Sequence, residues 1–123
     1  MRAGGSKPDG SPWLIAQERP EAGIREAMGA FELTDRAVAT SGTYRHCHDM
    51  GDRTISHTID PRTGRPTANA LSAVTVLAQT CMKADAWATA FLVMGSEKAT
   101  PLARIMGMDT VFVLADGTVQ SSL

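Results

Sequence analysis

The sequence has few aromatic residues, little net charge and no long apolar segment, and each of these absences excludes a class of protein. Phe, Trp and Tyr make up 5% of the 123 residues, too few for a stacking platform that binds single-stranded nucleic acid. Twelve basic side chains against 13 acidic ones give a net charge of −1, so nothing favours binding to DNA or to an anionic membrane. The apolar stretches fall far short of the roughly 18 residues of a transmembrane helix. A soluble globular domain is therefore predicted.

Cysteines and targeting signals are also scarce. Cys47 and Cys81 are far apart and lack the spacing of a zinc site, so we expect reduced thiols and no disulfide framework. The first residues, Met-Arg-Ala-Gly-Gly-Ser, carry a positive charge but no apolar segment. No signal peptide is therefore predicted, and a cytoplasmic location is expected for the chain as written.

Patterns typical of β-strands dominate the chain. Strands are predicted at residues 13–16, 31–39 and 53–59, the last because its β-branched residues favour extended backbone. Residues 72–78 are nearly all apolar, which predicts a strand buried on both faces. Residues 110–119 contain two apolar runs around an Asp-Gly pair, which predicts a β-hairpin.

One long helix is predicted over residues 81–94, which contain no Gly or Pro. Thr80 precedes it as a candidate N-cap, and Gly95 follows as a residue that ends a helix. A second short helix is predicted over 101–106, with Pro101 in its first turn. Strands outnumber helices, and several are adjacent in sequence. The predicted fold class is α+β, with a largely antiparallel sheet, one main helix at 81–94 and a C-terminal β-hairpin.

Asp85 and Thr89 are the first candidates for a functional site. Residues four apart lie on one face of a helix, so a carboxylate and a hydroxyl oxygen could converge there. Hard oxygen ligands of this kind suit Mg²⁺. The alternative is structural: a negative charge is favourable in the first turns of a helix, and Thr89 could hydrogen-bond to its own helix.

The second candidate is His57, which precedes the polar segment 60–66. That segment, Asp-Pro-Arg-Thr-Gly-Arg-Pro, contains too many turn residues for a helix or strand. A histidine presented beside a rigid loop is suited to act as a general base or to contact a phosphate. The alternative is a turn, opened by Asp60 and Pro61, that carries an incidental histidine.

Residues 46–49, His-Cys-His-Asp, are four potential metal ligands in a row. Adjacent residues on an extended chain point in opposite directions, whereas a tetrahedral zinc site needs spaced pairs. We therefore expect a solvated loop.

The order of these segments resembles the ApbE family, the FAD:protein FMN transferases. Residues 7–13, Lys-Pro-Asp-Gly-Ser-Pro-Trp, are similar to the family's Asp-Gly-x-x-Trp segment, and 40–45, Thr-Ser-Gly-Thr-Tyr-Arg, to its Ser-Gly-x-Tyr segment. Residues 57–66 resemble its most recognisable motif, His-x-x-Asp-Pro-x-Thr-Gly. Residues 74–76 and 84–90 resemble its Val-Thr-Val and Ala-Asp-Ala-x-Ala-Thr-Ala pair.

The resemblance implies an enzyme that cleaves the pyrophosphate of FAD with Mg²⁺. Such an enzyme passes FMN to a Ser or Thr hydroxyl of an acceptor protein, typically a flavin-carrying subunit of a membrane electron-transport complex. Carried over by motif, the resemblance implies Asp85 and Thr89 as magnesium ligands and His57 as a catalytic base. The residues expected to bind FAD are Ser41, Gly42, His57 and Asp60.

Members of this family run to about two or three times the length of a single domain of this size. The chain resembles their C-terminal part, so residues 1–123 are expected to be the C-terminal portion of an FMN transferase domain whose N-terminal half is absent. Full-length relatives are expected to be periplasmic or membrane-anchored lipoproteins. We expect weak or absent FAD turnover by the chain alone. Two alternatives stay open: an inactive truncated remnant, and a non-catalytic interaction module.

Overall fold

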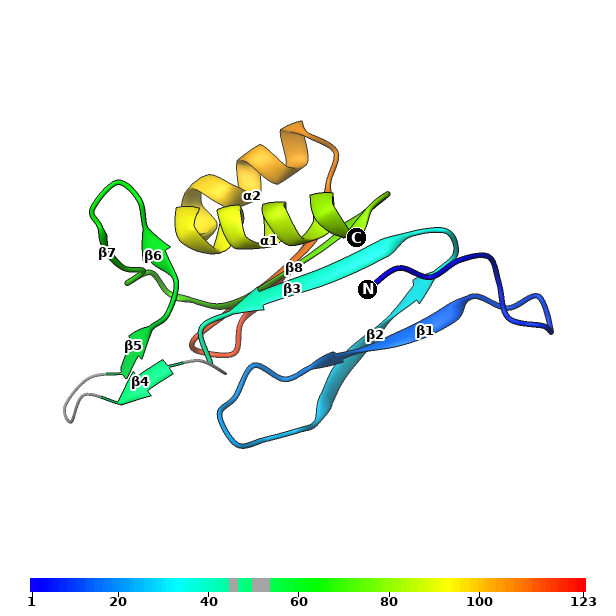
Figure 1. Cartoon of the computed structure of the whole chain (residues 1–123), viewed down its shortest axis with the longest axis horizontal. Helices are drawn as coiled ribbons and strands as arrows, with labels where there is room; N and C mark the ends of the chain where they lie inside the picture. The colour runs from blue at the N-terminus through cyan, green and yellow to red at the C-terminus, as the bar shows by residue number, and fades with distance from the viewer. Residues whose placement is uncertain (45–46, 50–53) are drawn as a thin grey trace.

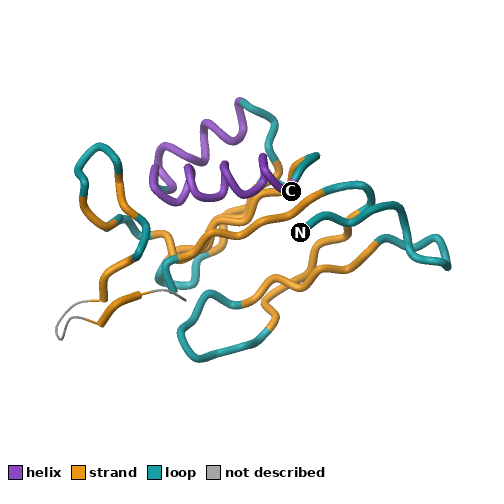
Figure 2. Tube along the Cα trace, viewed as in Figure 1, coloured by secondary structure: helices purple, strands orange, loops and turns teal. Residues whose placement is uncertain are grey.

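A four-stranded antiparallel sheet organises the structure, a computed structural model that describes residues 1–44, 47–49 and 54–123. Its strand order is β10-β9-β8-β3. A two-stranded ribbon packs on one face of the sheet and two helices pack on the other, giving three layers (Figure 1, Figure 2). The predicted α+β class with a largely antiparallel sheet is confirmed. The sheet contains Ala37–Gly42 (β3), Leu71–Ala78 (β8), Asp109–Leu114 (β9) and Val119–Ser121 (β10), the ribbon contains Trp13–Glu18 (β1) and Ala27–Leu33 (β2), and the helices are Cys81–Met94 (α1) and Ser96–Ile105 (α2).

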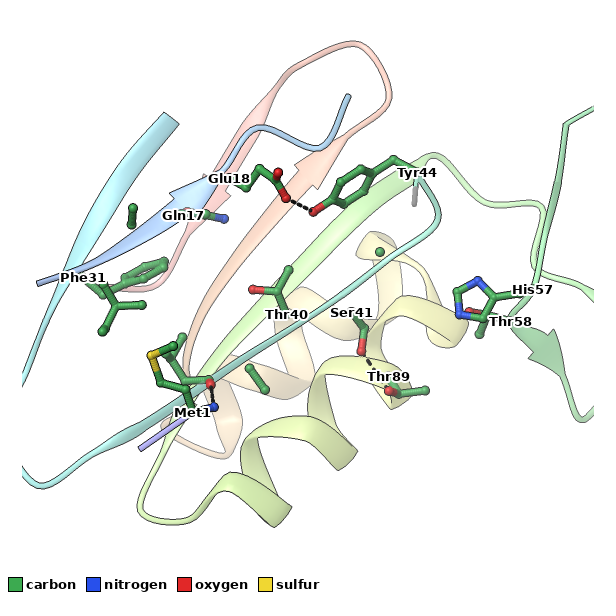
Figure 3. Close-up of a pocket in the computed structure, with 15 residues that line it drawn as sticks. Met1, Gln17, Glu18, Phe31, Thr40, Ser41, Tyr44, His57, Thr58 and Thr89 are labelled. Carbon is green, nitrogen blue, oxygen red and sulfur yellow. Dashed lines mark hydrogen bonds between the residues drawn. The ribbon is translucent and has the colours of Figure 1, made fainter. Parts of the chain in front are cut away.

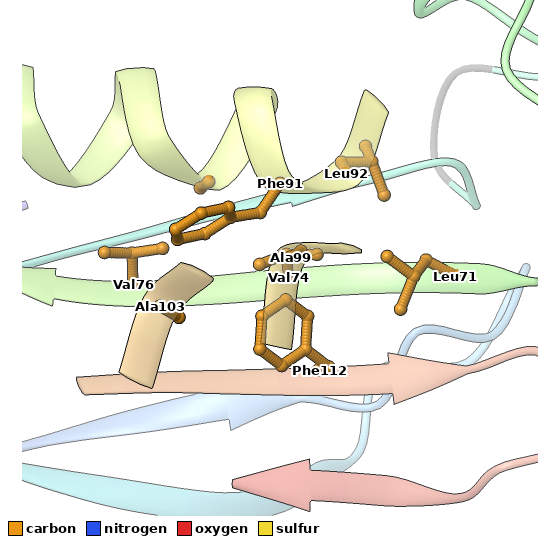
Figure 4. Close-up of a cluster of buried hydrophobic side chains, with 9 residues drawn as sticks. Leu71, Val74, Val76, Phe91, Leu92, Ala99, Ala103 and Phe112 are labelled. Atoms are coloured by element: carbon orange, nitrogen blue, oxygen red, sulfur yellow. The ribbon is translucent and has the colours of Figure 1, made fainter. Parts of the chain in front are cut away.

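The helix-side core forms where α1 and α2 cover β8 and β9. Phe91 of α1 is fully buried and contacts Phe112 of β9, with ring centroids 6.0 Å apart. Small residues of α2, Ala99 and Ala103, allow this helix to approach the sheet closely, and both are completely buried (Figure 4). Strand β8 contributes Val74 and Val76 to the same core, because residues two apart in a strand share a face. The core of this layer is Leu71, Val74, Val76, Ala88, Phe91, Leu92, Ala99, Ala103 and Phe112.

A second core lies between the opposite face of the sheet and the β1–β2 ribbon. Phe31 and Leu33 of β2 pack there against Ala73 and Leu77 of β8. Because β8 contributes apolar side chains to both cores, its interior residues are buried on both faces, as the sequence predicted.

Helix α1 has the bounds that the sequence predicted. The Oγ1 of Thr80 accepts a hydrogen bond from the backbone N–H of Lys83 at 3.3 Å, which satisfies one of the free donors of the first turn. Gly95 ends the helix with a positive φ of 81°, a conformation that costs glycine little. Both capping signals are local, so they could be recognised without knowledge of the fold.

Replacing Thr80 with Ala is expected to destabilise the protein by about 1 kcal/mol, because the first turn of α1 loses its side-chain acceptor. Urea unfolding followed by circular dichroism measures this difference. Thr34→Ala is the matched control, since Thr34 is exposed and outside any helix. Equal stability of the two variants would contradict the capping role.

The prediction of one strand over residues 31–39 is wrong, since the segment is divided between the β1–β2 ribbon and the main sheet. Strand β2 ends at Leu33, and β3 begins at Ala37. Asp35 turns the chain between them with a φ of 53°, and its Oδ1 accepts a hydrogen bond from the N–H of Gly5 at 2.8 Å. Asp tolerates this left-handed conformation better than most residues, which makes the reversal possible.

The second helix also differs from its prediction. It covers Ser96–Ile105 rather than 101–106, because Gly95 both ends α1 and begins α2. Pro101 therefore lies inside the helix and removes one backbone donor.

Two short antiparallel ribbons form where the sequence predicted two irregular segments, at 46–49 and 60–66, and a strand at 53–59. Cys47–Asp49 (β4) pairs with Thr54–Ser56 (β5), so the predicted solvated loop is a strand there, whereas His46 lies outside the described residues. Ile59–Asp60 (β6) pairs with Arg65–Pro66 (β7), so the segment expected to have no regular structure is a small hairpin. The strand predicted at 53–59 is interrupted between β5 and β6.

Candidate functional site

A cavity of about 480 Å³ lies between the β1–β2 ribbon and strand β3, which is an edge strand of the main sheet (Figure 3). It extends from the N-terminal residue to α1 and to the segment that follows β5. Its walls combine apolar and polar side chains, as in small-molecule sites generally. The residues that line it include Met1, Ile15–Glu18, Phe31, Val38–Gly42, Tyr44, His57, Thr58 and Thr89.

Three polar side chains from three strands meet beside this cavity, and two of them, Gln17 and Thr40, line it. Gln17 of β1 is 7% exposed, and its Nε2 donates a hydrogen bond to Oγ1 of Thr75 on β8 at 3.2 Å. The same Thr75 oxygen is 2.8 Å from Oγ1 of Thr40 on β3. Satisfied buried polar groups fix the positions of the elements that carry them. This network therefore holds the ribbon and the sheet at a set separation across the cavity.

Ser41 and Thr89 connect β3 with α1 at the edge of the cavity. Their hydroxyl oxygens are 2.8 Å apart (Figure 3). Two predicted site residues from separate motifs are thus in direct contact. Both belong to the group of hard oxygen ligands that Mg²⁺ prefers.

Gly42 follows Ser41 at a point where a larger residue would have to displace the Tyr44 ring. A Cβ added to Gly42 would lie 2.6 Å from the ring of Tyr44 and 3.0 Å from the backbone oxygen of Ser72. The phenol O–H of Tyr44 donates a hydrogen bond to the Glu18 carboxylate at 3.2 Å, linking this loop to β1 across the cavity (Figure 3). Gly42 thereby allows the close packing that brings Tyr44 into the cavity wall.

His57 lines the same cavity as Ser41, Gly42 and Thr89 (Figure 3). It is exposed and directly follows β5. The structure therefore brings together residues from three of the segments that the sequence singled out.

Asp85 is exposed on α1, one turn before Thr89. Ala84 and Ala88 are buried beneath this part of the helix, so the Asp85–Thr89 face is accessible. Asp85 does not line the cavity that Thr89 lines. The available oxygens are one carboxylate and two hydroxyls, which fits Mg²⁺ because that ion commonly takes one or two carboxylates and keeps several waters. Among the described residues, no three His, Cys, Asp or Glu side chains gather in one place, so an all-protein cage of these ligands is not present there.

Asp60 lies apart from the other predicted site residues. It lines a second cavity, and its carboxylate binds Arg62 with hydrogen bonds of 2.7 to 3.2 Å. These hydrogen bonds, together with the backbone N–H of Arg62, lower the pKa of Asp60 to about 2. Asp60 is therefore ionised at neutral pH and paired with Arg62.

The lowered pKa of Asp60 predicts a pH-dependent contribution to stability. A carboxyl whose pKa is lower in the folded protein than its usual 3.8 stabilises the fold above about pH 4, and this contribution disappears as the pH falls toward 2. The melting temperature of Asp60→Asn should therefore lie at most a few degrees below that of the original protein at pH 7. The two should converge near pH 2, as measured by thermal denaturation in a pH series. A difference that stays constant across the series would contradict this role.

Sequence reasoning missed the polar network, above all Gln17 and Thr75. Residues 72–78 were predicted as a nearly apolar strand, and Gln17 follows a short apolar run, so no local pattern separates either residue from ordinary strand positions. The two side chains meet only because β1 packs over β8. Within the described part of the chain, no helix has the length and apolar character to cross a membrane.

Comparison with known proteins agrees with the resemblance seen in the motifs. A family model described as "ApbE family" matches residues 1–112. The FAD:protein FMN transferase of Escherichia coli K12 is 33% identical over 117 residues, covering 95% of this chain and 33% of that protein. The enzyme of the same name from Vibrio cholerae serotype O1 is 44% identical over 103 residues, covering 84% of this chain and 31% of that protein.

Solved structures give the same result. The apo form of Pseudomonas stutzeri flavinyl transferase ApbE superposes with a TM-score of 0.78 at 40% identity, covering 98% of this chain and 38% of that one. The ApbE protein from Thermotoga maritima gives a TM-score of 0.85 at 31% identity, covering 96% of this chain and 38% of that one. The chain thus spans about a third of the length of the curated relatives that it matches.

Proposed function

Because the chain belongs to the ApbE family, we propose that it carries the metal-binding and catalytic part of an FAD:protein FMN transferase site. The reaction is transfer of FMN from FAD to a Ser or Thr hydroxyl of an acceptor protein. A bond forms between the acceptor oxygen and the FMN phosphorus, the bond to the bridging oxygen breaks, and AMP leaves. The observation that supports this function is the meeting of Ser41, His57 and Thr89, from three separate motifs, at one cavity.

The residues that would hold Mg²⁺ are Asp85 and Thr89, with the hydroxyl of Ser41 in contact with Thr89. When bound, the ion would neutralise negative charge on the diphosphate as the P–O bond breaks. Asp85 would supply the one negative charge of this ligand set. The short Ser41–Thr89 hydrogen bond would keep both hydroxyl oxygens at the edge of the cavity.

His57 is proposed as the base that takes the proton of the attacking hydroxyl. Histidine suits this role because its ordinary pKa lies near neutral pH. Its exposure leaves it accessible to an acceptor side chain, and its position on the cavity wall directs it toward bound FAD. Gly42 is proposed to contact FAD as part of the same cavity wall, next to the Tyr44 ring that packs against it.

The acceptor would be a flavin-carrying subunit of a membrane electron-transport complex. The names of the relatives support a protein acceptor, since each is an FAD:protein FMN transferase. A periplasmic or lipoprotein context would follow from that acceptor and remains part of this proposal.

A chimera tests the proposed function directly. Residues 1–112 replace the matching part of the Vibrio cholerae flavin transferase, whose structure superposes with a TM-score of 0.75. The chimera should release AMP from FAD and label an acceptor protein with flavin in the presence of Mg²⁺. A folded chimera that binds FAD but transfers no flavin would support the inactive remnant instead.

The role of His57 predicts a specific kinetic pattern in this chimera. His57→Gln should lower kcat by about a hundredfold or more and leave KM for FAD nearly unchanged, because a general base acts in the chemical step. Steady-state kinetics of AMP release measure both constants. A rise in KM with unchanged kcat would make His57 a binding residue only.

A further inference from the structure

The second cavity, of about 540 Å³, lies between the β6–β7 hairpin and the end of α1. In Figure 1 this hairpin projects beside the end of the helix. One wall is apolar and consists of Pro66, Val93 and Met94, whereas the hairpin provides arginine and threonine side chains. A ligand that fills such a space has an apolar body and a polar group directed at the hairpin.

Arg62 is fixed in the wall of this cavity. Its Nε and Nη2 donate to the Asp60 carboxylate at 2.7 to 3.2 Å, which leaves Nη1 without a hydrogen bond among the described residues. Because the pKa of Asp60 is lowered to about 2, its carboxylate is ionised at neutral pH and available to Arg62. A guanidinium oriented in this way loses less side-chain entropy when it binds a further group.

The cavity also has an excess of positive charge. The side chain of Arg65 lines it and has no ion pair or hydrogen bond within the described part of the chain. Lys98 is near enough for its charge to lower the pKa of Asp60. Asp60 compensates Arg62, so among the lining residues the charge of Arg65 remains, and it favours an anion.

Thr67 provides an independent observation. Its Oγ1 is buried and has no hydrogen-bond partner, the one such side-chain atom among the described residues. A buried hydroxyl without a partner costs stability, so its presence calls for an explanation. Thr67 lines the cavity, so a change of its χ1 rotamer is a short route by which this hydroxyl can reach a ligand there.

We propose that this cavity is an oxyanion-binding site for a carboxylate or phosphate carried on an apolar group. Arg65 provides the charge, Arg62 a fixed donor and Thr67 a hydroxyl donor. The site shares the segment after His57 with the candidate active site, since the backbone N–H of Thr67 donates to the oxygen of Thr58 at 2.9 Å. It goes beyond the proposed function and does not depend on FAD binding.

Nuclear magnetic resonance titration of the intact chain tests this proposal with two probes, inorganic phosphate and a blocked Leu-Asp dipeptide. We expect at least one probe to give saturable shifts at Thr67, with a change in its χ1 coupling. Arg65→Gln should weaken binding about tenfold or more, as loss of a charged hydrogen bond implies. Arg25→Gln, the matched control at an exposed arginine outside the cavity, should have no effect.

Thr67→Val separates a binding role from a structural one. This variant removes the unpaired hydroxyl with little change of shape, so its melting temperature should rise while its affinity falls. Binding of phosphate alone would identify a phosphate ligand, and binding of the dipeptide alone would identify an acidic peptide. The proposal is overturned if neither probe gives saturable shifts that Arg65→Gln removes. It is overturned equally if Thr67→Val binds as the original protein does.

Discussion

Replacing Asp85 with Asn is expected to abolish Mg²⁺-dependent flavin transfer by the chimera. The carboxylate is the one negatively charged ligand of the proposed set, whereas Ser41 and Thr89 contribute neutral hydroxyls. Loss of the ion would remove several kcal/mol of charge stabilisation from the transition state, which corresponds to a rate decrease of about a thousandfold. AMP release and flavin labelling of the acceptor, each measured over a range of Mg²⁺ concentrations, would show this loss.

The control for this substitution is Glu97→Gln. Glu97 is an exposed acid in the first turn of the neighbouring helix α2, so its replacement makes the same change in net charge without touching the proposed ligands. The control should retain transfer activity, and both variants should keep the circular dichroism of the original chimera because both positions are exposed. Normal transfer by Asp85→Asn would remove the metal assignment, even if His57 proved essential.

The elements that the sequence predicted most accurately, helix α1 and the C-terminal hairpin, are determined by residues close to them in the chain. Helix α1 has the expected bounds because Thr80 and Gly95 act on the backbone next to them. The C-terminal hairpin likewise depends on its own Asp-Gly turn, and the N–H of Gly117 donates to the oxygen of Leu114 at 3.0 Å. In both cases a few neighbouring residues determine the outcome, so no tertiary contact needs to be known.

The sequence-based predictions failed where contacts between distant segments determine the structure. Apolar and polar residues do alternate within residues 31–39, but Leu33 and Ala37 belong to two strands that pair with different partners. A periodic pattern does not show where one strand ends and the next begins. The hydrogen bond between Gln17 and Thr75 joins residues 58 positions apart. Likewise, the motif that carries His57 and Asp60 divides between two cavities, because Asp60 belongs to the β6–β7 hairpin whereas His57 precedes it.

Replacing Phe91 with Ala is expected to cost about 3 to 5 kcal/mol of stability, the largest effect that we expect from a substitution in the folded chain. The side chain is completely buried between α1 and the sheet, with ring centroids 5.1 Å from Trp87 and 6.0 Å from Phe112. Removal of the ring leaves a cavity that Ala99 and Ala103 are too small to fill. Urea unfolding of the isolated chain, followed by circular dichroism, measures the loss.

Met82→Ala on the same helix provides the comparison. Met82 is 75% exposed, so its truncation should change the unfolding free energy by no more than about 0.5 kcal/mol. Domains of this size are stable by about 5 to 15 kcal/mol, so Phe91→Ala should bring the chain close to unfolding at room temperature. Because α1 also carries Asp85 and Thr89, a loss of this size would disorder the proposed magnesium ligands together with the core. If the two variants unfolded at the same urea concentration, α1 would not be anchored through Phe91, and the position of both ligands would need another explanation.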